Sequence, residues 1–96
     1  MSEYFQFKTG SIFPVVVYTK DPCPYCDLVL RLLKNFKYEF EERDLTDQPN
    51  EMLRLKEETG WRTFPIVIIR DQVIGGYTDI KALHDQGLLQ GLVNPQ

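Results

Sequence analysis

The sequence predicts a single α/β domain in which helices flank a mixed sheet of four strands, in the order β-α-β-α-β-β-α. Continuous runs of β-branched and aromatic residues at 13–19 and 66–69 indicate strands that are buried on both faces. Segments with the apolar spacing and the end signals of helices lie between and after these runs, so helices should cover the sheet. Ninety-six residues supply one hydrophobic core without room for a second, and we therefore expect one domain over 1–96.

The first half of the chain predicts a strand, a helix and a second strand. Strand 13–19 ("FPVVVYT") leads into a helix over about 24–36. Apolar residues that recur every fourth position predict the buried stripe of this helix: Leu28, Leu32 and Phe36, with Val29 and Leu33 beside them. The segment 38–45 ("YEFEERDL") alternates apolar and polar residues, which predicts a more exposed strand. Two strands joined by a helix form a parallel β-α-β unit.

The segment "FPIVIIRDQVIGG" predicts an antiparallel hairpin. Its first strand is 66–69, a tight turn follows at 70–72, and a short strand ends at 75–76. The parallel unit and the hairpin together make the predicted sheet a mixed one. Residues 1–12 form an N-terminal extension without a clear assignment, although the alternation in "YFQF" can supply an edge strand.

Two further helices complete the predicted order. The first spans 49–59, with a proline at its start, and ends before Gly60. The last spans about 78–86, where Thr78 or Asp79 can cap the N-terminus.

Composition and charge exclude several classes of function. The formal net charge of −3 and the scattered basic residues argue against a nucleic-acid partner. No apolar run approaches the roughly twenty residues of a membrane span. The start "MSEYFQFKTGSIF" lacks the basic and apolar regions of a secretory signal, so we expect a cytoplasmic location without membrane contact.

Both cysteines of the chain lie at the start of the first predicted helix, in "DPCPYCDLVL". A structural zinc site needs four ligands, and beyond the two cysteines the chain offers His84 far away on the last helix. A structural staple between Cys23 and Cys26 would close too small a loop to restrict the unfolded chain much. Cytosolic disulfides are more often catalytic than structural, and a Cys-X-X-Cys pair between a buried strand and a helix is a strong redox signal.

The position of Cys23 predicts which thiol reacts first. At a helix N-terminus its sulfur faces unpaired N–H groups and the positive end of the helix dipole, so its pKa should lie well below the free value of about 8.5. Cys26 lies one turn further along nearly the same face and should be more buried. We therefore expect Cys23 to attack a disulfide and Cys26 to resolve the mixed disulfide. Pro24 suits the first helical position, where a missing N–H costs nothing.

Three motifs, "YTKDPCPYC", "TGWRTFP" and "GGYTD", resemble those of the dithiol glutaredoxins in order and separation, over roughly residues 14–88. The resemblance implies a thioredoxin-like fold and an enzyme that reduces protein disulfides and glutathione mixed disulfides. Glutathione would be a co-substrate, with no permanently bound cofactor and no metal. The implied partners are glutathione and disulfide-containing or glutathionylated client proteins, and we expect a monomer.

Matched residue by residue, the resemblance makes Cys23 the nucleophile and Cys26 the resolving thiol. It also implies a set of glutathione contacts: Lys20, Tyr25, Arg62, Phe64, Pro65, Thr78 and Asp79. The peptide bond before Pro65 would be cis, which lets the backbone of Phe64 pair with glutathione like a strand edge. Phe64 replaces the usual valine, and Met52 stands where many members carry a polar contact. Trp61 is large and is expected near the glutathione groove, but the resemblance assigns it no role.

Three alternative functions remain open at this point. A redoxin fed by thioredoxin reductase, which donates electrons to ribonucleotide reductase, shares the fold but generally lacks the glutathione-side residues, so Lys20, Thr78 and Asp79 favour glutathione. A [2Fe–2S] carrier would use Cys23 from two chains together with two glutathiones, and Pro24 disfavours it. A redox-silent binding module would have an unreactive Cys23.

Overall fold

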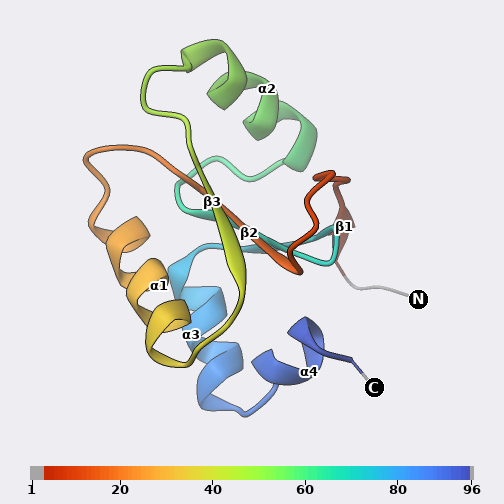
Figure 1. Cartoon of the computed structure of the whole chain (residues 1–96). Coiled ribbons are helices and arrows are strands. Elements are labelled where there is room, and N and C mark those ends of the chain that lie inside the picture. Colours follow the sequence, from red (N-terminus) through yellow and green to blue (C-terminus); the bar gives the residue numbers. More distant parts are fainter. Residues whose placement is uncertain (1–3, 96) are drawn as a thin grey trace.

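A five-stranded sheet in the order β1-β5-β4-β2-β3 forms the centre of the fold in the computed structural model, which describes residues 4–95 (Figure 1). Nine elements follow one another along the chain: β1 (Phe5–Gln6), β2 (Val15–Thr19), α1 (Pro24–Asn35), β3 (Phe40–Asp44), α2 (Pro49–Thr59), β4 (Ile66–Ile69), β5 (Gln72–Gly75), α3 (Tyr77–Asp85) and α4 (Leu89–Val93). The predicted α/β class is confirmed, and the predicted order β-α-β-α-β-β-α is found from β2 to α3, with β1 before it and α4 after it. No helix of this part of the chain is long and apolar enough to span a bilayer.

The pairing of the strands makes the sheet a mixed one, as predicted. β2 runs parallel to β3 and antiparallel to β4, with Val15 opposite Phe40 on one side and Ile69 on the other. β4 and β5 form the predicted hairpin. Every residue of β2 and β4 is buried, because helices cover both faces of the sheet at its centre.

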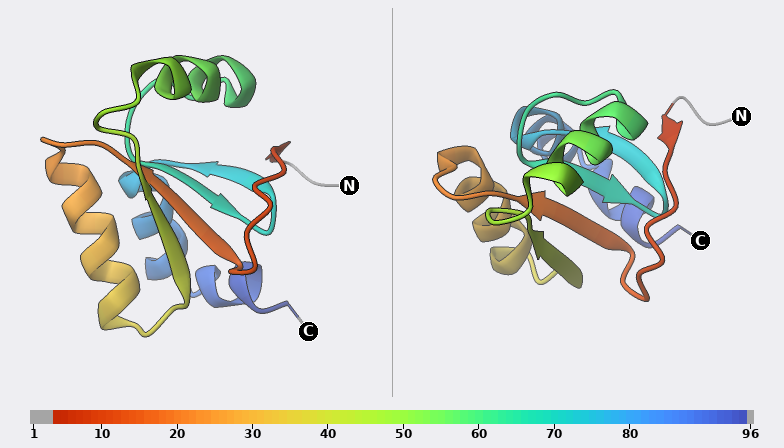
Figure 2. Two further views of the ribbon diagram at one scale, coloured as in Figure 1. Left: turned by 45° about the horizontal axis from the view of Figure 1, so that its top comes forward. Right: turned by 90° about the horizontal axis from the view of Figure 1, so that it is seen from above.

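Alternate residues of the central strands feed two separate apolar clusters. Val15 and Val17 face α1, α3 and α4, whereas Val16 and Tyr18 face α2. Figure 2 shows these helices on opposite faces of the sheet. This two-sided cover explains why β2 reads as a continuous apolar run instead of an alternating one.

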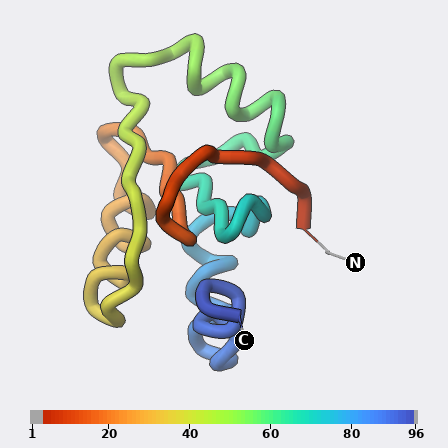
Figure 3. Tube along the Cα trace, turned by 45° about the vertical axis from the view of Figure 1, so that its right-hand side comes forward, coloured from red at the N-terminus to blue at the C-terminus, as the bar shows by residue number. Residues whose placement is uncertain are grey.

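The predicted sheet of four strands was one strand short. β1 pairs antiparallel with β5, Phe5 opposite Val73, so "YFQF" does add an edge strand. The chain then forms an open arc past the β4–β5 turn (Figure 3), where the Phe7 N–H donates to the Asp71 carbonyl at 2.8 Å. The part of the predicted extension before Tyr4 lies outside the described residues.

Two local predictions about the helices were right in part. Val29, Leu32 and Leu33 of the predicted stripe are buried together with Cys26, whereas Leu28 and Phe36 are 37% and 56% exposed. The stripe that contacts the sheet is therefore shifted toward Cys26. The helix α3 begins at Tyr77 with Gly76 as its N-cap, and Asp79 caps it from the third helical position, where its carboxylate accepts the Gly76 N–H.

Candidate active site

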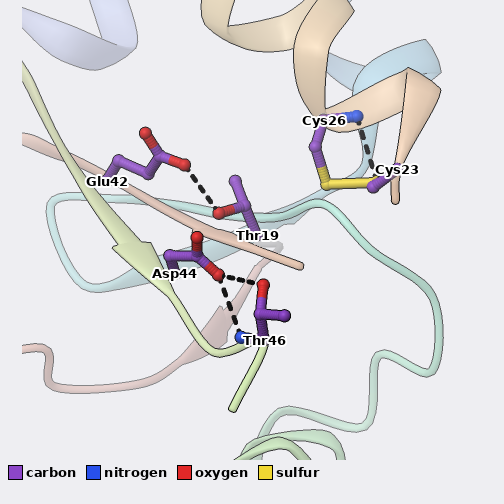
Figure 4. The surroundings of a disulfide bond; sticks show 6 residues. All are labelled: Thr19, Cys23, Cys26, Glu42, Asp44 and Thr46. Carbon is purple, nitrogen blue, oxygen red and sulfur yellow. Dashed lines mark hydrogen bonds between the residues drawn. A yellow bond between two sulfur atoms is a disulfide. The ribbon is translucent and has the colours of Figure 1, made fainter. Parts of the chain in front are cut away.

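Cys23 is the N-cap residue of α1, directly after the strand β2 and its loop. Its backbone is extended, and its Sγ accepts a hydrogen bond from the Cys26 N–H at 3.2 Å (Figure 4). Pro24 occupies the first turn of the helix, where no N–H is missed. Cys23 is half-buried, whereas Cys26 is 2% exposed. The geometry predicted for an attacking and a shielded thiol is therefore present.

The two sulfurs form a disulfide, so the structure represents the oxidised protein. The Cα atoms of Cys23 and Cys26 are 5.2 Å apart, within the usual range for bridged cysteines. The first turn of α1 can therefore close the dithiol by itself. The thiolate released from Cys23 on reduction would face the N-terminal amides of the helix, which stabilise an anion.

A groove of about 340 Å³ lies beside the disulfide. Its lining comes from the turn of Cys23 and Cys26, the segment before β4 and the start of α3: Tyr25, Trp61, Thr63, Phe64, Pro65 and Gly76–Asp79. Five residues that the resemblance assigns to glutathione thus meet in one groove although they are far apart in sequence: Tyr25, Phe64, Pro65, Thr78 and Asp79.

The segment before β4 has the backbone that the resemblance implies. The Phe64–Pro65 peptide is cis, and so is Asp21–Pro22, which the sequence analysis did not anticipate. The Phe64 backbone makes no hydrogen bond within residues 4–95, so its N–H and C=O are available to a peptide ligand. The Phe64 side chain is 8% exposed and packs in the cluster below α2, with Lys56 Nζ 5.5 Å from its ring centroid. This aromatic side chain is therefore largely core, and the unpaired backbone of Phe64 can serve as the edge of the groove.

The start of α3 forms the other end of the groove. The Gly76 N–H donates to Asp79 Oδ2 at 3.0 Å, which holds the carboxylate at the helix N-terminus. Asp79 is half-buried and Thr78 is exposed. Gly75 has φ +134°, and a Cβ built there would lie 2.5 Å from Asp79 Oδ2 and 2.9 Å from Trp61 Cη2. The close approach and the backbone conformation both require glycine at this position.

Two aromatic residues of the groove had no role assigned from the sequence, although Trp61 was expected near the groove. Trp61 lies across Gly75 and Gly76, and its Nε1 is buried without a hydrogen-bond partner in the described part of the chain. Tyr77 stacks on Tyr25, with ring centroids 6.0 Å apart and planes 30° apart. The available sequence signal for Trp61 was its position, because it lies between Gly60, which ends α2, and Pro65, which precedes β4.

Lys20 and Arg62 do not line this groove. Lys20 is exposed and lines a second cavity of about 350 Å³, on the Cys26 side of the disulfide, together with five acids: Asp21, Asp27, Glu42, Asp44 and Asp47. In that region the Thr19 hydroxyl donates to Glu42 at 2.8 Å, and the side chain and backbone N–H of Thr46 hold the pKa of Asp44 below its usual value (Figure 4). Arg62 is exposed. The roles of both cations stay predictions.

Met52 and His84 also have defined surroundings. Met52 is half-buried and packs against the cluster below α2, as an apolar replacement for a polar contact should. His84 lies on α3 with its ring centroid 4.1 Å from that of Phe36. Among residues 4–95, no group of three or more histidine, cysteine or acidic side chains is arranged to hold a metal ion.

Comparisons with known proteins point to one family. The family model described as Glutaredoxin matches residues 15–74. The chain is 33% identical over 82 residues to a glutaredoxin of Neisseria meningitidis serogroup A, which covers 84% of this chain and 96% of that protein. It is 36% identical over 83 residues to the mitochondrial glutaredoxin-2 of Pongo abelii, covering 83% of this chain and 52% of the relative. This chain thus spans about half the length of that mitochondrial relative.

Solved structures agree with the sequence comparisons. The solution structure of a glutaredoxin from Brucella melitensis has a TM-score of 0.75 at 36% identity, over 90% of this chain and 94% of that one. The crystal structure of a buckwheat glutaredoxin–glutathione complex has a TM-score of 0.77 at 31% identity, over 83% of this chain and 76% of that one.

Proposed function

Since the chain belongs to the glutaredoxin family, we propose that it is a glutathione-dependent thiol-disulfide oxidoreductase whose reactive groups are Cys23 and Cys26. One observation carries this proposal. Cys23 is the N-cap of α1, where its sulfur accepts a hydrogen bond from the Cys26 N–H. It lies beside a groove whose other end is the N-terminus of α3. A thiolate nucleophile and a binding site for a peptide-like thiol are therefore adjacent.

The first step is attack of the Cys23 thiolate on the glutathione sulfur of a protein–glutathione disulfide. A new S–S bond forms between Cys23 and glutathione, the old S–S bond breaks, and the client leaves as a thiolate that takes a proton from water. A second glutathione thiolate then attacks the glutathione sulfur on Cys23, which releases glutathione disulfide and restores the Cys23 thiolate.

The dithiol route uses Cys26 in place of the second glutathione. The Cys26 thiolate attacks the sulfur of Cys23, glutathione leaves as a thiolate, and the Cys23–Cys26 disulfide of this structure results. Two glutathiones then reduce that disulfide and leave as glutathione disulfide. Protein disulfides follow the same sequence, with the client bound to Cys23 in the mixed disulfide.

The groove supplies the binding groups for the glutathione moiety. The free backbone edge at Phe64 pairs with the cysteinyl part of the tripeptide. The N-terminus of α3 attracts the γ-glutamyl carboxylate, and the Asp79 carboxylate receives the ammonium group. Tyr25 and Tyr77 form the aromatic wall on the side of the cysteines. Lys20 and Arg62 are not among the residues that line the groove in the oxidised form, and we propose that they contact glutathione at its edges.

The test is reduction of a glutathione mixed disulfide by the wild type and the two single cysteine variants. Cys23→Ser should abolish turnover, whereas Cys26→Ser should retain much of it, because a second glutathione replaces the resolving thiol. Equal loss in both variants would contradict these roles. Coupling the assay to glutathione reductase or to thioredoxin reductase separates the proposed enzyme from a redoxin that serves ribonucleotide reductase.

We also propose that the protein acts as a monomer in the cytoplasm, on glutathionylated or disulfide-containing clients. Support comes from the dithiol itself, because a cytosolic glutathione pool keeps such a pair in turnover. Sedimentation of the reduced protein and fractionation of the source cells test the two parts separately. A brown dimer with visible absorbance after anaerobic purification would instead favour the iron–sulfur carrier.

A further inference from the structure

A cavity of about 540 Å³ lies at the opposite end of the sheet from the cysteines. Pro14 precedes β2, Tyr38 precedes the parallel strand β3, and Arg70 follows the antiparallel strand β4, so all three meet at one end. Cys23 follows the other end of β2. In Figure 1 the last turn of α1 and the helix α4 border the end that carries the cavity. It is therefore separate from the glutathione groove.

Aromatic side chains give this cavity one apolar wall. Tyr38 is half-buried, whereas Leu89 and Val93 of α4 are each 1% exposed and lie behind the lining, where a ligand would barely touch them. Burial raises the pKa of Tyr38 above its ordinary value, so its phenol stays protonated at neutral pH. Phe36 and His84 contribute two adjacent rings to the wall. This surface suits the planar or apolar body of a small molecule.

Two cations from different parts of the chain line this cavity. Lys37 comes from the loop after α1 and Arg70 from the β4–β5 turn. The Arg70 Nε–H donates to the Val93 carbonyl at 2.8 Å, which orients the guanidinium over α4. Its terminal nitrogens and the Lys37 ammonium form no ion pair within residues 4–95, and Glu39 is the one acid among the lining residues described.

The backbone at these two cations has an unusual conformation. Lys37 has φ +61° and Arg70 has φ +47°, in the region where glycine is the favoured residue. At Lys37 the Tyr38 N–H donates to the Leu33 carbonyl at 2.9 Å, the helix ending in which glycine is usual. The chain thus keeps long cationic side chains at two positions where glycine would be more stable.

We propose that this cavity binds a small organic phosphate. The phosphate group lies between Arg70 and Lys37, whose side chains are the standard partners of such an anion. The ring-shaped body lies against the adjacent rings of Phe36 and His84. The volume of about 540 Å³ falls in the usual range for small-molecule sites.

The experiment is an NMR titration of the full ¹⁵N-labelled chain with adenosine monophosphate, inorganic phosphate and adenosine, at constant ionic strength. Adenosine monophosphate should shift the amide signals of Lys37, Arg70 and Asn94 in a saturable way. Inorganic phosphate and adenosine should each bind at least about tenfold more weakly, because each offers one half of the contacts. The amide signals of Cys23 and Gly76 should stay in place.

Variants separate loss of binding from loss of folding. Lys37→Gly and Arg70→Gln should each weaken binding of adenosine monophosphate about tenfold. Lys37→Gly also relaxes the left-handed backbone, so its melting temperature should be unchanged or higher. Lys8→Gln makes an equal charge change at an exposed position outside the cavity and should bind like the wild type.

Several outcomes would overturn the proposal. It is wrong if no saturable shift occurs at the cavity, or if adenosine binds as tightly as adenosine monophosphate. It is also wrong if Lys37→Gly and Arg70→Gln both retain wild-type affinity. None of these readouts depends on thiol chemistry, so they stand apart from the activity proposed for Cys23.

Discussion

Gly75→Ala should destabilise the fold and distort the glutathione groove at the same time. The backbone at φ +134° costs an L-residue about 1–3 kcal/mol. The new Cβ would lie 2.5 Å from Asp79 Oδ2 and 2.9 Å from Trp61 Cη2, and such overpacking costs about 1–3 kcal/mol more. The total loss in free energy of unfolding is therefore about 2–6 kcal/mol.

Urea denaturation followed by circular dichroism measures this loss, and Gly87→Ala is the matched control. Gly87 has φ +73° with no atom within 4 Å of a built Cβ, so alanine there should cost about 1–2 kcal/mol from the backbone alone. In an Asp79→Ala background the nearest clash is absent, and Gly75→Ala should cost about 1 kcal/mol less than in the wild type. The reasoning fails if Gly75→Ala costs no more than Gly87→Ala, or if the Asp79→Ala background makes no difference.

Three further predictions concern the reactive thiols, the groove and acid stability. In the reduced protein Cys23 should alkylate faster than Cys26, which is 2% exposed; mass spectrometry of the modified peptides decides. Trp61→Ala should raise KM for a glutathionylated peptide about tenfold, because it removes an aromatic wall of the groove, and should lower kcat less. Steady-state kinetics measure both constants, and a fall in kcat alone would contradict this prediction. The Arg43 hydrogen bond holds the pKa of Glu41 below its ordinary value of 4.5. This carboxylate therefore stabilises the fold above pH 4.5 and loses its contribution as the pH falls through the lowered pKa. Glu41→Gln should make the melting temperature depend less on pH in that acidic range.

Much of the fold was predictable because its signals are local. The buried runs of β2 and β4, the helix start at the cysteines and the glycine after α2 all depend on neighbouring residues. The weakest local signal, alternation over "YFQF", belongs to a strand of two residues, and its pairing with β5 completes the sheet. The stripe assigned to α1 failed only at Leu28 and Phe36, because the sheet packs against Cys26, Val29, Leu32 and Leu33 and leaves those two residues at the exposed edge.

The candidate site divides in the same way. The sequence indicated that Cys23 reacts before Cys26, and the resemblance implied a backbone edge at Phe64 that binds glutathione. The cis peptide between Phe64 and Pro65 agrees with the second expectation.

The resemblance assigned Tyr25, Phe64, Pro65, Thr78 and Asp79 to glutathione, and all five line the groove. The contacts of Trp61 with Gly75 and of Tyr77 with Tyr25 were not predictable, because they join distant stretches of chain. Lys20 lies close to Cys23 in sequence and yet lines another cavity.

By itself the amino-acid sequence determined where strands and helices form and that a thiol lies at a helix N-terminus, because hydrogen bonding and side-chain periodicity within a few residues govern both. The tertiary structure alone decided the stacking of Tyr77 on Tyr25, the glycine-only contact of Gly75 with Trp61 and Asp79, and the cationic cavity at the far end of the sheet. Those features join residues that are far apart in the sequence. Whether they meet depends on the path of the whole chain and on the direction of each side chain, and a local sequence pattern predicts neither.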